Sequence, residues 1–357
     1  MSLVERLKAE IRLSGPLTVA QFMTACLHDP VDGYYATRPR LGADGDFITA
    51  PMVSQMFGEL LGLWSAEVWV RLGRPARVIW AEAGPGDGSL IGDALRAVRA
   101  APAFMTAAEL WLVETSGPLA AIQGERLAAS PVRPHWCADL AALPDDAPLI
   151  LIANEVLDCL PARQFVRTPG VWAERMVGLD EDGALVFGLG YAPVDGLAPD
   201  AAPGEVLEIS AAQSAFGAGI GQRMARQGGA SLLIDYGRAE PGFGDTLQAL
   251  KGHRKVSPLE TPGEADLTVH ADFPAVLAAA EAEGAEVAGP LDQGRFLAVL
   301  GLEARAAALS RARPDAAATI RRQFDRLIAP DQMGELFKAV CIAQPGLACP
   351  GFEETQA

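Results

Sequence analysis

Three glycines on alternate positions are the first residues in this sequence whose spacing points to chemistry. Gly84, Gly86 and Gly88 are preceded by the short apolar run Val78–Trp80 and by the acid Glu82. A glycine turn between a strand and a helix lets a ligand approach the backbone, because no Cβ stands in the way. The helix that follows offers unpaired N–H groups and the positive end of its dipole. The stretch therefore predicts a nucleotide-type cofactor site, with a plain glycine-rich turn as the alternative.

Polar side chains stand where the next predicted strands end. Glu114 closes a second strand and Asp139 follows a third. Asn154 and Glu155 follow a fourth. Because ligands bind at the carboxyl ends of parallel strands, these side chains are expected to line one site. Each acid taken alone has the alternative role of a helix cap or a surface carboxylate.

Two cofactors compete for such a site. An NAD fingerprint places the third glycine five positions after the first and an acid about 20 residues further on. Here the third glycine, Gly88, comes one place early. The acid Glu114 lies farther from Gly84 than the acid of an NAD fingerprint lies from its glycines. This spacing favours S-adenosylmethionine over NAD(P). The acid Glu114 is then expected to accept both ribose hydroxyls, Asp139 the adenine amino group, and Glu82 to support the methionine ammonium.

The residues around these positions predict an α/β fold with a Rossmann-like sheet. Short apolar runs alternate with segments whose apolar residues recur at helical spacing, which is typical of a parallel sheet covered on both faces. The runs predicted as strands are Val78–Trp80, Leu110–Glu114, Arg133–Cys137, Pro148–Ala153, Ser231–Ile234, Arg295–Leu302 and Leu336–Ile342.

The N-terminal part of the chain is predicted to be mostly helical. Two helices are expected within residues 3–27, and a long helix from Pro51 to about Leu72. A polar loop, Gly45–Pro51, leads into this long helix. We expect this loop, and Thr49 within it, to lie over the cofactor as a lid. A helix cap with one surface acid is the alternative.

Residues 164–209 interrupt the alternation of strands and helices. Two apolar runs flank Asp180–Gly183, and Asp-Gly between such runs is a hairpin signal, so we predict an inserted β element. Residues 238–264 are predicted to form a long loop with a basic cluster at 251–255. The expected divisions are an N-terminal helical, cofactor-covering region (1–75), the first half of the core (76–163), an inserted substrate region (164–230), the second half of the core (231–345) and a tail (346–357).

Charge and composition exclude several classes of function. The 357 residues carry a formal net charge of −16, which argues against nucleic-acid binding, because that function needs a basic face. The five cysteines form no C-x-x-C pair and no disulfide framework, which favours a reducing compartment, and no metal-ligand spacing is present. No apolar run is long enough to insert into a membrane. Glu5 and Glu10 are unlike a transit peptide, so a cytoplasmic location is expected.

Beyond the glycine turn, several stretches resemble one family, in order along the chain. Glu82–Gly88 resembles motif I of the class I S-adenosylmethionine-dependent methyltransferases. More narrowly, the chain is similar to the MidA-like family, the methyltransferases of mitochondrial complex I assembly and their bacterial relatives. The matching stretches are Gly33–Tyr35, Gly45–Pro51, Ser54–Trp64, Glu82–Arg96, Ala153–Pro161, Leu232–Gly237, Ala265–Thr268 and Met333–Lys338. Residues 164–209 carry no matching motif.

This resemblance implies a fold, a cofactor and a reaction. It implies a seven-stranded methyltransferase sheet with N-terminal helices and an insertion, S-adenosyl-L-methionine as cofactor, and methyl transfer to a protein arginine. The mitochondrial members act on a core, quinone-proximal subunit of respiratory complex I, so a protein substrate of this kind is expected. With this family in view, Asn154, Glu155 and Asp158 are the candidate catalytic residues. The two carboxylates are expected to orient the guanidinium and take its proton, while Asn154 orients the donor or holds the acceptor.

Two other functions remain open from the sequence. An NAD(P)-dependent oxidoreductase would need an acid/base pair of the Tyr-Lys or His type, and the sequence offers no clear one. A non-catalytic complex I assembly factor would keep the cofactor fold and grip a partner with the hairpin of residues 164–209. For Glu155 and Asp158, capping of the following helix or turn is the alternative role. The sequence sets no expectation for the oligomeric state.

Overall fold

The computed structural model describes residues 1–37, 49–191 and 201–353, and the chain folds into two compact units. The first unit comprises Met1–Phe47, Leu157–Gln213 and Glu240–Asp272, and the second comprises Ile48–Val156, Ser214–Ala239 and Phe273–Ala357. Neither unit is one continuous stretch, whereas the sequence pattern predicts divisions that follow one another along the chain. Each unit is described by itself below.

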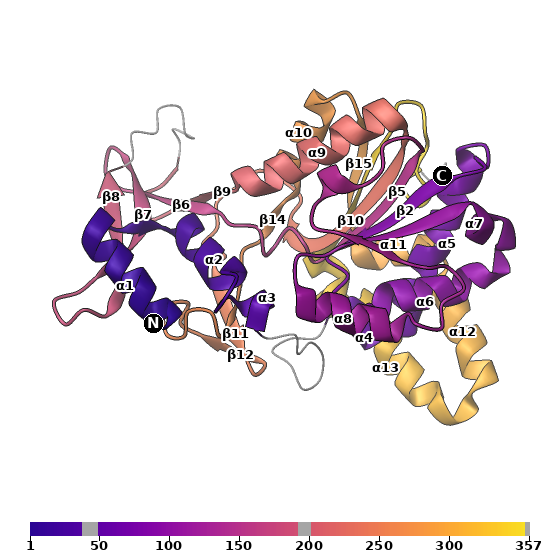
Figure 1. Cartoon of the computed structure of the whole chain (residues 1–357), viewed down its shortest axis with the longest axis horizontal. Coiled ribbons are helices and arrows are strands. Elements are labelled where there is room, and N and C mark those ends of the chain that lie inside the picture. Colours follow the sequence, from indigo (N-terminus) through magenta and orange to yellow (C-terminus); the bar gives the residue numbers. More distant parts are fainter. Residues whose placement is uncertain (38–48, 192–200, 354–357) are drawn as a thin grey trace. The chain divides into compact units, whose positions relative to one another are not determined.

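The second unit contains a mixed central sheet, in which β2, β5 and β10 lie side by side (Figure 1). Its strands are β2 (Val78–Ala83), β3 (Ala108–Val113), β4 (His135–Cys137), β5 (Leu149–Asn154), β10 (Gly229–Arg238), β15 (Glu286–Asp292) and β16 (Phe337–Ala343). They pair in the order β15-β16-β10-β5-β2-β3-β4. The pairs from β4 to β10 are parallel, and β16 runs antiparallel to both of its neighbours. Crossovers between parallel strands bring their carboxyl ends to one edge, as the sequence pattern predicts.

Helices pack on this sheet through apolar residues. The helices that belong wholly or mainly to the second unit are α4 (Ala50–Val53), α5 (Gln55–Arg71), α6 (Ser89–Ala97), α7 (Pro102–Ala107), α8 (Gly117–Arg126), α9 (Ala211–Gln227), α10 (Phe273–Ala282), α11 (Gln293–Val299), α12 (Leu302–Ala312) and α13 (Ala317–Ile328). Trp80 and Ile152 of the sheet share one core with Phe57 of α5 and Ile91 of α6.

Small residues set how closely α5 and α6 approach. A Cβ added to Gly62 of α5 would lie 2.7 Å from the Cα of Ala94 in α6, so only glycine fits there. The same holds at Gly58, where a Cβ would lie 2.7 Å from the carbonyl oxygen of Leu90. This close packing fixes α6, whose first residue is Ser89, directly after the glycine turn.

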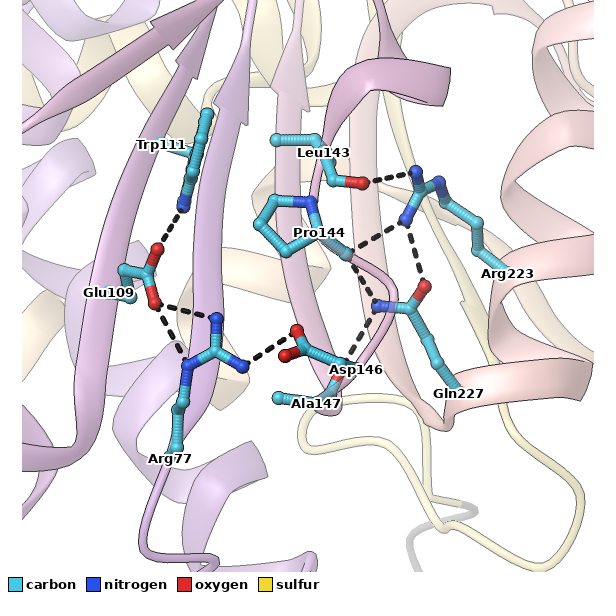
Figure 2. A network of polar contacts seen from close by, with 9 residues as sticks. All are labelled: Arg77, Glu109, Trp111, Leu143, Pro144, Asp146, Ala147, Arg223 and Gln227. Carbon is cyan, nitrogen blue, oxygen red and sulfur yellow. Dashed lines mark hydrogen bonds and ion pairs between the residues drawn. The ribbon is translucent and has the colours of Figure 1, made fainter.

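The amino ends of the strands are held by a separate polar network (Figure 2). Arg77, just before β2, donates to Glu109 of β3 at 2.9 Å and to Asp146 at 2.7 Å. Arg223 of α9 donates to the carbonyl of Leu143 at 2.8 Å, and Gln227 to that of Ala147 at 2.9 Å. The network therefore ties the loop before β5 to its neighbours and fixes where that strand begins.

The first unit combines helices with small antiparallel sheets. Its elements are α1 (Leu3–Ser14), α2 (Val19–His28), α3 (Tyr34–Thr37), β1 (Leu17–Thr18), β6 (Arg163–Arg167), β7 (Trp172–Leu179), β8 (Leu185–Tyr191), β9 (Val206–Ile209), β11 (Gln248–Lys251), β12 (Arg254–Val256), β13 (Asp266–Thr268) and β14 (Ala271–Asp272). Strands pair as β1-β7-β6-β9, with β8 on β7, and as β12-β11-β13. Both long helices begin with a capping box, which Ser2 and Glu5 supply in α1.

Several local predictions can be compared with these elements. The hairpin expected at Asp180–Gly183 is confirmed, because β7 and β8 pair from Leu179 and Leu185 outward. The strand expected at Arg295–Leu302 is wrong, because most of this run forms helix α11. A short apolar run alone does not distinguish a strand from a buried helix, which explains the error. The long loop expected at residues 238–264 contains the hairpin β11–β12.

Two further features were not expected. Cys341 of β16 and Cys349 form a disulfide, although the spacing of the cysteines predicts no disulfide framework. The long helix expected from Pro51 is divided into α4 and α5 at Ser54, which caps α5 by accepting the N–H of Met56. Within the described residues, no helix has the length and apolar character needed to cross a membrane.

Candidate functional site

The glycine turn after β2 adopts the backbone conformation that its sequence predicts. Gly84, Gly86 and Gly88 have φ angles of +63°, +55° and +79°, in the left-handed region that disfavours other residues. The N–H of Gly88 donates to the carbonyl of Pro85 at 2.8 Å and closes the turn. Asp87 Oδ1 accepts the N–H of Ser89 at 2.9 Å, at the start of α6. The turn thus presents backbone at the carboxyl end of β2, as a ligand cradle requires.

Glu82, the one acid of β2, is buried and comes just before this turn. Its exposed fraction is 2%, and burial raises the pKa of its carboxyl to about 8. The nearby charges of Asp87 and Glu114 raise this pKa as well, whereas a hydrogen bond from the backbone N–H of Ile91 lowers it. Among the described residues, none hydrogen-bonds to Glu82 Oε2. A buried acceptor of this kind suits a ligand that brings a donor or a positive charge.

Glu114 follows β3 and is held by donors from two directions. Its Oε1 accepts the backbone N–H of Ser116 at 2.7 Å, and its Oε2 accepts Nε2 of Gln123 at 2.9 Å. Burial raises the pKa of Glu114, while these hydrogen bonds and one from Thr115 lower it. A carboxylate offers about four lone-pair sites. The arrangement therefore orients the group and leaves acceptor capacity for the hydroxyls of a ligand.

Asn154 and Glu155 stand at the carboxyl end of β5. Asn154 Nδ2 donates to Glu155 Oε1 at 2.9 Å, and the backbone N–H of Ala50 donates to the same oxygen at 3.3 Å. Glu155 has a φ of +54°, which is uncommon for a residue with a side chain and costs about 1–2 kcal/mol. Its own N–H donates to the carbonyl of Ile234 in β10 at 2.8 Å. Backbone strain of this kind concentrates at functional sites.

Asn154 also has an unused acceptor. Its side chain is 7% exposed, and within the described part of the chain Oδ1 finds no hydrogen-bond partner. Together with Glu82 Oε2, two buried oxygens at the ends of neighbouring strands lack donors from the residues that the structure describes. These orphaned acceptors, the glycine cradle and the oriented Glu114 fit a ligand that carries hydroxyl groups and an ammonium group. The residues present therefore fit S-adenosyl-L-methionine.

The remaining predicted site residues are Thr49, Asp139 and Asp158. Thr49 is the N-cap residue of α4 but makes no side-chain capping bond there; residues 45–48 of the expected lid lie outside the described residues. Asp139 is exposed and caps the short helix Leu140–Ala142, accepting the N–H of Ala142 at 2.8 Å. Asp158 is 7% exposed and belongs to the first unit, whereas Glu155 belongs to the second.

Gln123 is the residue of this site that the sequence analysis missed. It is fully buried on α8 and contacts both Glu114 and the glycine turn. A signal was present, because Gln123 stands between Leu119 and Leu127 at helical spacing, in the position of an apolar residue. A polar side chain in such a stripe needs buried partners.

Comparison with known proteins gives one consistent result. The model of a family of S-adenosyl-L-methionine-dependent methyltransferases matches residues 60–291. The chain is 33% identical to protein arginine methyltransferase NDUFAF7 of Danio rerio, over 94% of this chain and 86% of that protein. It is also 33% identical to NDUFAF7 of Homo sapiens, over 94% of this chain and 82% of that protein.

Solved structures agree with these relatives. A crystal structure of a protein from Burkholderia thailandensis bound to S-adenosyl-homocysteine superposes with a TM-score of 0.84 at 30% identity. The superposition covers 98% of this chain and 92% of the Burkholderia thailandensis chain. A second crystal structure from Burkholderia thailandensis, solved in its native form, gives a TM-score of 0.86 at 30% identity, over 99% of this chain and 94% of that one.

One prediction is corrected by the comparison. The expected cytoplasmic location is wrong, because the relatives from Danio rerio, Bos taurus and Homo sapiens are named as mitochondrial proteins. The expectation rested on the acids within residues 1–13. Those residues form α1, with Leu3, Leu7 and Ile11 buried in the core of the first unit, so their composition reflects folding rather than a compartment.

Proposed function

The chain belongs to the family of S-adenosyl-L-methionine-dependent methyltransferases, and we propose that it methylates an arginine of a protein substrate. The observation that carries the proposal is the strained Glu155, whose carboxylate is held at the carboxyl end of β5 by Asn154 and by the N–H of Ala50. The relatives named protein arginine methyltransferase support an arginine as acceptor. The finer proposal, a core subunit of respiratory complex I as substrate, rests on the family resemblance of the sequence.

The second unit's own residues would hold the cofactor through four sets of groups. Glu114 would accept the ribose hydroxyls, and the turn Gly84–Gly88 would contact the cofactor through its own backbone atoms. The orphaned oxygens of Glu82 and Asn154 suit the ammonium of its methionine part. Asp139 is proposed to accept the adenine amino group, although its Oδ1 already accepts a backbone N–H.

The chemistry of the acceptor explains why carboxylates are needed. When bound, S-adenosyl-L-methionine supplies an electrophilic methyl group. A guanidinium is a poor nucleophile because its charge is delocalised over three nitrogens. The carboxylate of Glu155 would hold two of its N–H groups, direct the third nitrogen towards the methyl group, and accept the proton released after transfer. The hydrogen bonds from Asn154 and Ala50 keep Glu155 in one orientation for this task.

Asp158 completes the proposal on different grounds. Asp158 belongs to the first unit. Its part in binding the acceptor is proposed only from its position in the sequence, three residues after Glu155. Replacing each carboxylate in turn separates the two contributions.

The test is the variant Glu155→Gln, which keeps the shape of the side chain and removes its charge. Turnover with protein substrate is expected to fall about a hundredfold, the usual scale for a lost acid/base group. The dissociation constant for S-adenosyl-homocysteine, measured by calorimetry, should stay within about threefold, since binding changes of that size are below 1 kcal/mol. Glu303→Gln, at an exposed position in the first turn of α12, is the matched control. Unimpaired turnover in Glu155→Gln would remove Glu155 from the reaction.

A further inference from the structure

Gln123 of α8 connects three parts of the second unit through one amide group. Its Nε2 donates to the carbonyl of Gly86 at 2.8 Å and to Glu114 Oε2 at 2.9 Å. Its Oε1 accepts Nε1 of Trp136, on β4, at 2.9 Å. The glycine turn, the acid after β3 and the neighbouring strand β4 therefore meet at a single buried side chain.

The orientation of this amide is fixed by the chemistry of its neighbours. The indole N–H of Trp136 is a donor only, so it must face the oxygen of Gln123. Glu114 and the carbonyl of Gly86 offer acceptors, so they must face the nitrogen. Both N–H groups of the amide then have a partner, and a flipped amide would lose all three hydrogen bonds.

The packing around α8 leaves this side chain little freedom. Gln123 is fully buried, and a Cβ added to Gly88 would lie 3.6 Å from the Cα of Gln123. The helix therefore passes close enough to the glycine turn for Gln123 to hydrogen-bond to the carbonyl of Gly86. A side chain held in this way keeps the separation between Glu114 and Gly86 constant.

We propose that Gln123 is a positioning residue, which holds the ribose-binding carboxylate of Glu114 at a fixed place relative to the glycine turn. This inference rests on the proposed role of Glu114. With Ser116 donating to one carboxylate oxygen and Gln123 to the other, the group is oriented before a ligand arrives. Binding then avoids the cost of ordering it, which is how preorganisation raises affinity.

The chain offers a matched control for this residue. Gln227 of α9 is also a helical glutamine, and its Nε2 donates to the carbonyls of Ala147 and Pro144 at 2.9 and 3.4 Å (Figure 2). Its Oε1 accepts from Arg223 at 2.8 Å. This amide lies at the amino ends of the strands and touches no ligand-binding carboxylate. Replacing it tests the cost of losing a bridging amide as such.

The experiment compares Gln123→Met with Gln227→Met in the full-length protein. Methionine keeps the length of the side chain and removes its hydrogen bonds. Calorimetry measures the affinity for S-adenosyl-homocysteine and for its analogue lacking both ribose hydroxyls, while thermal unfolding reports stability. Gln123→Met should weaken S-adenosyl-homocysteine binding about tenfold to a hundredfold, the effect of a lost hydrogen bond to a charged group. Binding of the analogue should change by less than about threefold, because the analogue makes no use of the carboxylate. Gln227→Met should lower stability and leave both affinities unchanged.

A third variant separates this inference from the proposed ribose site. If Glu114→Ala weakens binding of S-adenosyl-homocysteine and Gln123→Met adds nothing in that background, the two residues act as one unit, as proposed. If Glu114→Ala leaves the affinity unchanged, the ribose site itself is wrong. If Glu114→Ala weakens binding but Gln123→Met does not, or weakens both ligands equally, only the positioning role of Gln123 is overturned.

Discussion

Replacing Glu82 by glutamine should change how the stability of this protein depends on pH. In the folded protein, burial raises the pKa of Glu82 to about 8, from an ordinary value of 4.5. The unfolded chain therefore releases this proton near pH 4.5, while the folded protein keeps it until about pH 8. Between these values the folded state binds more protons than the unfolded state, so stability falls as the pH rises.

The size of the effect follows from the same two values. Each pH unit between them costs about 1.4 kcal/mol, so the span amounts to roughly 5 kcal/mol in the free energy of unfolding. Glutamine does not titrate, so Glu82→Gln removes this loss. The variant should be more stable than the wild type at pH 8, and the difference between the two proteins should shrink towards pH 5.

The assay is unfolding by urea at a series of pH values from 5 to 8.5, with Glu303→Gln as a control at an exposed position. The control should keep the slope of the wild type. If Glu82→Gln loses stability with pH as steeply as the wild type does, the folded protein does not keep a proton on Glu82 up to about pH 8, and the reasoning from its burial is refuted.

Two further predictions concern opposite ends of the sheet. Gly84→Val should strongly reduce the affinity for S-adenosyl-homocysteine, because φ is +63° at this position and the new Cβ would lie 2.8 Å from Cγ2 of Val156. If calorimetry finds an unchanged affinity, the glycine turn is not part of the cofactor site. Arg223→Met should lower the free energy of unfolding by about 1–3 kcal/mol, because the carbonyl of Leu143 loses its donor. The affinity for the cofactor should stay the same. A combined loss of stability and affinity in Arg223→Met would show that the two ends of the sheet are coupled.

The alternation of strands and helices was predictable because its signals are local. Pro148–Ala153 is wholly apolar, and all of it but Pro148 lies in β5. Arg295–Leu302 is just as apolar but forms mostly helix α11, since packing rather than composition decides such short runs. The sequence also could not predict that each unit is built from three separate segments of the chain. Which segments form a compact unit depends on which of them pack together and not on their order in the sequence.

The candidate site was predictable where it follows from strand ends. Glu114 and Asn154 stand at the ends of β3 and β5, as the pattern of apolar runs indicated. The left-handed backbone of Glu155 and the triple contact of Gln123 could not be read from sequence, because both depend on how neighbouring elements meet. The same is true of the disulfide between Cys341 and Cys349, since only the fold shows that the intervening chain returns.

The central claim is that this chain transfers a methyl group from S-adenosyl-L-methionine to a protein arginine. It is tested most directly by incubating the purified protein and S-adenosyl-L-methionine carrying a labelled methyl group with lysate proteins, and analysing the labelled protein after complete hydrolysis. The account predicts that the label is recovered as methylarginine, and that Glu155→Gln abolishes most of it. Label recovered on another amino acid or on a small molecule, or no label while calorimetry shows that the cofactor binds, would contradict it.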